Sequence, residues 1–78
     1  MKAPTKQDLE KDTEPTLENI AAQMTKRGFL AKVEKGFVSV PSENSKGFNY
    51  AIIGLEMFFN KRLCVNRTAQ NFLLCPYL

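Results

Sequence analysis

Histidine is absent from the 78-residue sequence, and cysteine occurs only twice, at Cys64 and Cys75. Without an imidazole, the chain cannot form a Ser–His or Cys–His nucleophilic pair or use a histidine acid or base. Two cysteines alone fall short of the four ligands of a structural zinc site. The four glycines do not have the spacing of a phosphate-binding loop. We therefore expect a protein that is not an enzyme and that uses no cofactor and no metal ion.

Long apolar runs are also missing from the chain. No stretch approaches the length of about 18 apolar residues that a membrane span requires. The first 16 residues, MKAPTKQDLEKDTEPT, contain neither an apolar core nor a small-residue cleavage site, unlike a secretory signal. We expect a cytoplasmic protein with reduced thiols and no membrane partner.

Charge is distributed unevenly along the sequence. Residues 1–18 carry three lysines against five carboxylates, a net charge of −2. Residues 19–78 carry eight lysines and arginines against three glutamates, a net charge of +5. This positive excess either serves solubility or attracts an acidic partner.

Apolar periodicity divides the chain into a polar arm and one small domain. Residues 1–12 contain too few large apolar side chains to bury a core, so we expect a flexible N-terminal arm. A single α+β domain then covers residues 13–78. Its first element is a helix, because Leu17, Ile20 and Met24 recur with helical spacing.

Residues 29–40 alternate between apolar and polar side chains on both sides of Gly36. Alternation of this kind around a glycine predicts a β-hairpin. Pro41 is expected to end the second strand, because proline cannot donate to a sheet ladder.

The segment FNYAIIGLEMFFN, residues 48–60, is compatible with a helix or a strand. Helical spacing relates its larger apolar residues, whereas strict alternation fails at two places, so a mostly buried helix is favoured. Gly54 costs about 1 kcal/mol inside a helix. We therefore expect Gly54 to mark a close approach to the first helix, at Ala21 or Ala22.

The last segment predicts a second hairpin, with one strand face formed by Leu63 and Val65. If the chain turns between Ala69 and Gln70, Cys64 lies directly opposite Cys75. Two reduced, packed thiols are favoured there over a disulfide or a redox role. The predicted fold is αββαββ, a four-stranded antiparallel sheet with two helices on one face.

Basic residues supply the candidate contact surface. Lys26–Arg27 and Lys61–Arg62 both follow helical segments, where they complement the helix dipole, and at related positions they could also form one basic face. The expected partner-binding residues are Lys26, Arg27, Lys32, Lys35, Lys61, Arg62 and Arg67. The aromatic residues Phe48, Phe58 and Phe59 are assigned to the core, and Phe37 and Tyr77 are the candidates for exposed rings.

The sequence contains no motif of a known family. In its small size and lack of motifs it resembles in style the accessory proteins of phages and mobile elements, such as anti-CRISPR inhibitors, although no residue carries this likeness. The first hypothesis is a non-enzymatic inhibitory protein that occludes a site on a protein or ribonucleoprotein partner. Its contact surface would be the exposed sheet face or the basic helix ends. The alternatives are a nucleic-acid-binding regulator that uses a basic face, as a monomer or as a homodimer, and a structural homo-oligomer.

Overall fold

The computed structural model describes residue 5 and residues 13–44 and 46–77. The predicted flexible arm, residues 1–12, therefore lies outside the described residues, apart from Thr5. In chain order the elements are α2 (Leu17–Lys26), β1 (Lys32–Glu34), β2 (Phe37–Pro41), the short 3-10 helix η1 (Ser42–Asn44), α3 (Phe48–Phe59), β3 (Leu63–Arg67) and β4 (Asn71–Pro76).

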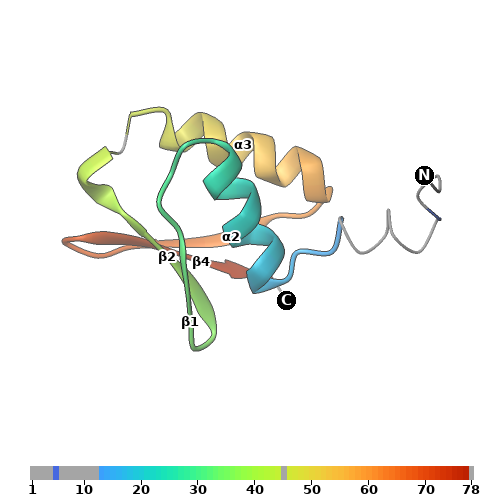
Figure 1. Ribbon diagram of the computed structural model, residues 1–78, viewed down its shortest axis with the longest axis horizontal. Coiled ribbons are helices and arrows are strands. Elements are labelled where there is room, and N and C mark those ends of the chain that lie inside the picture. Colours follow the sequence, from blue (N-terminus) through green and yellow to red (C-terminus); the bar gives the residue numbers. More distant parts are fainter. Residues whose placement is uncertain (1–4, 6–12, 45, 78) are drawn as a thin grey trace.

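The four strands form one antiparallel sheet in the order β1-β2-β4-β3. The two hairpins meet at β2 and β4, and α2 and α3 lie on the same face of the sheet (Figure 1). The predicted αββαββ fold is confirmed. No helix in the described part of the chain is long and apolar enough to cross a membrane.

The ends of α2 follow directly from its flanking residues. The Thr16 hydroxyl accepts a hydrogen bond from the Asn19 N–H at 3.2 Å, which caps the first turn. At the other end Gly28 has a φ of 91°, and the Phe29 N–H donates to the Met24 carbonyl at 3.1 Å. This is the pattern of a Schellman stop, which needs a residue in the left-handed region.

The first hairpin is shorter than the apolar–polar alternation of residues 29–40 predicts. Its first strand begins only at Lys32, because Phe29 turns inward and meets the Phe48 ring edge-on at 5.9 Å. The second hairpin has the predicted register, in which Cys64 is the Cα partner of Cys75. Both thiols are free.

One apolar core lies between the helices and the sheet. The Phe48 ring from α3 stacks on the Phe72 ring from β4, with centroids 3.8 Å apart. The buried residues come from both helices and from three of the four strands, and they are Ile20, Met24, Val38, Val40, Phe48, Ala51, Leu55, Phe59, Leu63, Phe72 and Leu74.

Residues 48–60 were the ambiguous segment, and the structure confirms the helix over Phe48–Phe59. The expectation that this helix is mostly buried is wrong, because one of its sides faces solvent. The assignment of Phe58 to the core is also wrong, since this ring is 38% exposed and only its edge-on neighbour Phe59 is buried.

Gly54 does not mark a close approach of α3 to Ala21 or Ala22. The atoms nearest to a Cβ added at Gly54 belong to the Arg27 guanidinium, at 3.5 Å. At this position the neighbour of α3 is therefore the flexible side chain of Arg27, which follows α2, and not the body of α2 itself.

Candidate functional site

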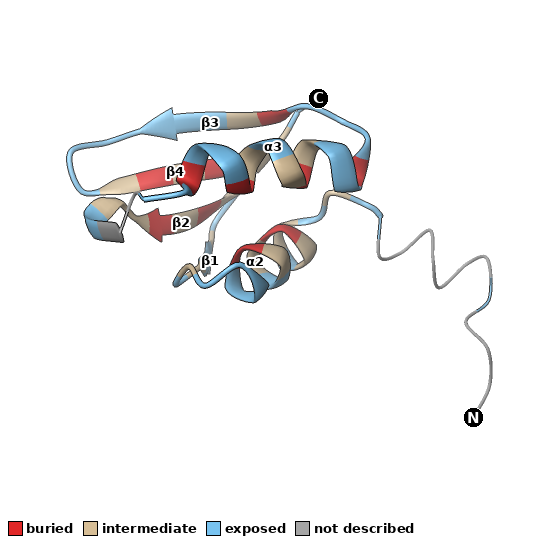
Figure 2. Ribbon diagram, turned by 90° about the horizontal axis from the view of Figure 1, so that it is seen from above, coloured by how far each residue is buried: buried red, intermediate tan, exposed pale blue. Residues whose placement is uncertain are grey.

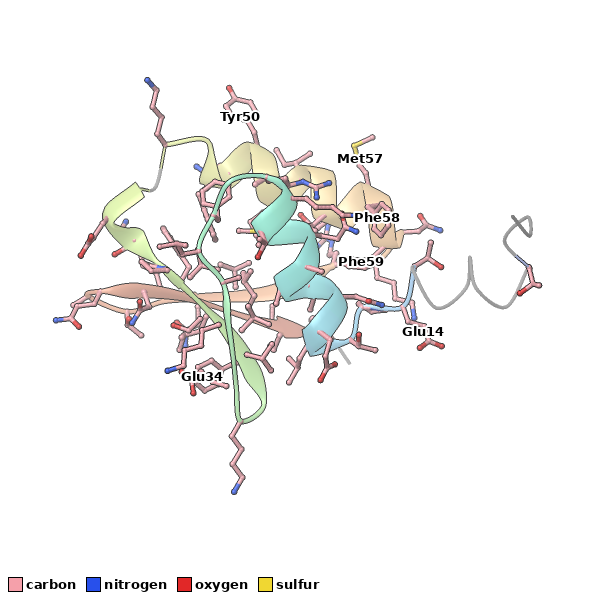
Figure 3. The ribbon with its side chains drawn as sticks, in the orientation of Figure 1. Glu14, Glu34, Tyr50, Met57, Phe58 and Phe59 are labelled. Atoms are coloured by element: carbon pink, nitrogen blue, oxygen red, sulfur yellow. The ribbon has the colours of Figure 1, made fainter. Side chains whose placement is uncertain are left out.

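Three large side chains project into solvent from the outer side of α3. Tyr50 is 82% exposed, Ile53 53% and Met57 77%. Their spacing of three and then four residues places them in a single row along the helix, which we call the α3 stripe. Figure 3 shows Tyr50 and Met57 projecting from α3 on the side opposite to the sheet.

The α3 stripe is not required by the core of the protein. The inner side of α3 already contributes Phe48, Ala51, Leu55 and Phe59 to the core, all of them buried. A helix on the surface of a small domain normally has one apolar side, which faces the core. Contiguous apolar surface on a small domain is therefore a feature that requires a functional explanation.

Charged residues border the stripe at the C-terminal end of α3. A hollow of about 400 Å³ lies there, lined by Ile53, Glu56, Met57, Asn60, Lys61 and Arg62. Lys61 and Arg62 are both exposed. The chain turns at Asn60, which has a φ of 54°, and the Lys61 N–H donates to the Glu56 carbonyl at 3.2 Å. This turn holds the two cations beside the apolar row.

The structure distributes the seven predicted contact residues over separate places. α2 and α3 run in opposite directions over the sheet, so Lys26–Arg27 and Lys61–Arg62 lie at opposite ends of the helical layer (Figure 2). They do not come together as one basic cluster. Lys61 and Arg62 line the hollow beside the α3 stripe, and the Arg27 guanidinium lies next to Gly54 in the middle of α3.

The other predicted cations have local partners or isolated positions. The Arg27 guanidinium donates to the Gln23 carbonyl and to its side-chain Oε1, both at 3.0 Å. Lys32 forms an exposed ion pair with Glu34 at 3.6 Å. Lys35 lies in the turn between β1 and β2, and the Arg67 guanidinium lies 5.6 Å from the centre of the Phe72 ring.

The open face of the sheet, opposite to the helices, holds the second candidate surface. There Phe37 from β2, Leu73 from β4 and the two cysteines are all partly exposed. A hollow of about 500 Å³ is lined by Gly36, Phe37, Cys64, Val65, Asn66, Leu73 and Cys75. The pKa of the Cys75 thiol is raised, first by burial and then by the hydrogen bond and the charge of Cys64.

Reasoning from the sequence missed the α3 stripe because it expected this helix to be mostly buried. A usable signal was present, since positions 50, 53 and 57 have their own helical spacing, separate from that of Phe48, Leu55 and Phe59. The sequence therefore contained two apolar rows on this helix, of which the core uses one.

No protein-family model, no curated protein and no solved structure matches this chain. A functional proposal therefore has to come from the surfaces described above.

Proposed function

We propose that this protein is a non-enzymatic binding protein that docks on a partner protein through the α3 stripe together with Lys61 and Arg62. By docking, it occludes a site on that partner, which makes it an inhibitor. The observation that carries the proposal is the exposure of Tyr50 and Met57, at 82% and 77%, on a helix whose inner side already forms the core.

The residue types of the stripe suit a protein interface. Tyrosine and methionine are enriched at the centres of interfaces, whereas lysine and glutamate belong to the rim. An amphipathic helix that lays an apolar row into a groove anchors through residues three, four and seven positions apart. Tyr50, Ile53 and Met57 have this spacing, and Glu56, Lys61 and Arg62 supply the polar rim.

The free energy of burying its side chains shows how much the α3 stripe can contribute to binding. Fully burying a large apolar side chain yields about 1.5–3 kcal/mol. Three such side chains yield about 5–9 kcal/mol, which is comparable to the cost of about 4–15 kcal/mol for association. The stripe therefore supplies the anchors of an interface, and neighbouring surface has to complete it.

Charge defines the chemistry of the partner. Lys61 and Arg62 border the stripe, and residues 19–78 carry a net charge of +5. The complementary surface is an apolar groove bordered by aspartate or glutamate, because opposite charges steer the encounter and orient the two proteins.

The partner can be identified by photo-crosslinking from the stripe itself. A benzophenone amino acid at position 50 is expected to crosslink to one cellular protein, whereas the same group at the exposed Tyr77 gives no such product. With the purified partner, Met57→Asp should weaken binding about 30-fold, the effect of a central hot spot. Leu30→Asp is the matched control, because Leu30 is 76% exposed and Met57 is 77% exposed.

Several outcomes would contradict the proposal. Equal losses of affinity for Met57→Asp and Leu30→Asp would show that the stripe is not the contact. A dimeric mass in light scattering that Met57→Asp abolishes would assign the stripe to a second copy of this chain. Binding of nucleic acid without any protein crosslink, with an affinity that falls steeply with salt, would favour the nucleic-acid-binding regulator instead.

A further inference from the structure

Cys64 and Cys75 form a dithiol pair on the open face of the sheet, away from the α3 stripe. They are Cα partners in the β3–β4 ladder, and both are free and partly exposed. Directly opposed residues in an antiparallel pair have Cα atoms about 4.5–5.5 Å apart. That separation lies inside the range of about 4.4–6.8 Å that a disulfide spans without backbone movement.

Small reagents can reach the pair. Both cysteines line the hollow of about 500 Å³ on the open face, together with Phe37 and Leu73. Among the described residues β3 is an edge strand of the sheet, so Cys64 has a strand neighbour there on one side only. Opposed, accessible thiols on an edge hairpin are the geometry in which thiol–disulfide exchange proceeds to an intramolecular bond.

We propose that Cys64 and Cys75 are a reversible oxidation site, which a small-molecule disulfide such as glutathione disulfide converts into a cross-strand disulfide. In the first step the Cys64 thiolate attacks one sulfur of glutathione disulfide. A mixed disulfide forms, the glutathione S–S bond breaks, and one glutathione thiolate leaves. In the second step the Cys75 thiolate attacks Cys64 Sγ, which forms the Sγ–Sγ bond and releases the second glutathione.

The reaction balances without any other reagent. The two protons of the protein thiols end on two glutathione thiols, and the protein loses two electrons that reduce glutathione disulfide. The order of the two steps follows from the environment of each thiol. The pKa of Cys75 is raised by burial and by its neighbour, so Cys75 keeps its proton longer and acts second.

The expected effect of the disulfide is a covalent link that holds the edge strand on the sheet. The bond ties β3, which follows α3 through Asn60–Arg62, to the inner strand β4. This inference does not depend on the protein-binding proposal, because the dithiol and the α3 stripe lie on opposite sides of the sheet.

The test is an equilibrium titration of the full chain in glutathione buffers, quenched with acid and read by mass spectrometry. The wild type should lose two hydrogens as a monomer, become resistant to alkylation at both cysteines, and recover with dithiothreitol. The Cys75→Ser variant should instead accumulate one glutathione at Cys64, because it lacks the second thiol.

A matched control moves one thiol out of register on the same face. In Leu73→Cys combined with Cys75→Ser, the two cysteines are diagonal neighbours with Cα atoms about 7–8 Å apart, beyond the Cα separation that a disulfide spans. Its equilibrium constant for ring closure should be at least about tenfold below that of the wild type. Far-UV circular dichroism shows that both proteins are folded at the start of the titration.

A second control places a directly opposed pair of thiols two residues further along the same two strands. Asn66→Cys with Leu73→Cys, in a background of Cys64→Ser and Cys75→Ser, should close as the wild type does, because residues 66 and 73 are also Cα partners. Three results would overturn the proposal: glutathione on both wild-type cysteines, disulfide-linked dimers as the main product, or closure of the out-of-register variant to the same extent. An unreactive wild type would overturn it as well.

Discussion

The two helices lie on the same face of one sheet, yet their outer sides differ. α2 buries Ile20 and Met24 and turns polar residues, such as Glu18 and Lys26, to solvent. α3 buries four residues and still exposes the α3 stripe, with Tyr50 at 82%. The comparison shows that the core requires only the inner side of a helix, and that the apolar outer side of α3 needs another explanation, for which we propose a protein contact.

The two helices begin differently but end alike. α2 begins after Thr16, whose hydroxyl caps the first turn, whereas α3 begins after Gly47, which has no side-chain oxygen to cap it. Both helices end in a Schellman motif, at Gly28 and at Asn60. The start of α3 therefore depends more on packing against the sheet than the start of α2 does.

The largest expected effect tests whether the inner sides of the helices are equivalent. Met24 in α2 and Leu55 in α3 are both fully buried, at 0% exposure. Met24→Ala and Leu55→Ala should each lower the free energy of unfolding by about 2–5 kcal/mol, because each leaves a cavity. Urea denaturation measures both values.

Such losses approach the whole stability of about 3–5 kcal/mol that a domain of this size usually has. Both variants should therefore be largely unfolded at 37 °C. A cost below about 1 kcal/mol for either variant would show that the corresponding helix does not pack as described.

An intermediate effect tests the local signals of α2. Thr16→Ala removes the oxygen that accepts from the Asn19 N–H at 3.2 Å. The free energy of unfolding should fall by about 1 kcal/mol, within the usual range of about 0.5–2 kcal/mol for an N-cap. Thr16→Ser keeps the acceptor and serves as the control in the same thermal denaturation series. An equal loss for both variants would contradict the capping role.

The smallest effect tests how closely the two helices approach. A Cβ at position 54 would lie 3.5 Å from the Arg27 guanidinium, which is ordinary contact with a flexible side chain. Gly54→Ala should therefore raise the free energy of unfolding by about 0.5–1 kcal/mol, the difference in helix propensity. A loss of stability in thermal denaturation would support a tight helix–helix contact at this glycine instead.

Much of the fold could be predicted from local patterns. The spacing of Leu17, Ile20 and Met24 and the stop at Gly28 define α2, because capping and periodicity act within a few residues. The register of the last hairpin could also be predicted, since the turn position alone makes Cys64 the partner of Cys75. Phe29 deviated from its alternating pattern because a tertiary contact with Phe48 replaced strand pairing.

The candidate site was less predictable than the fold. Lys61 and Arg62 were among the expected contact residues. They remain predicted contact residues, because they lie beside Ile53 and Met57 in the same hollow. The stripe itself was missed, because a helix with apolar residues on more than one side does not reveal from its sequence which side meets the core.

The sequence by itself determined the element order, the hairpin register and the absence of histidine chemistry, since each depends on residue type and on near neighbours along the chain. Only the tertiary structure decided the rest. It selected the row of Phe48, Leu55 and Phe59 for the core and left Tyr50, Ile53 and Met57 outside, because the sheet offers α3 a single apolar face. It also separated the two basic pairs, because two antiparallel helices have their C-terminal ends at opposite ends of the layer.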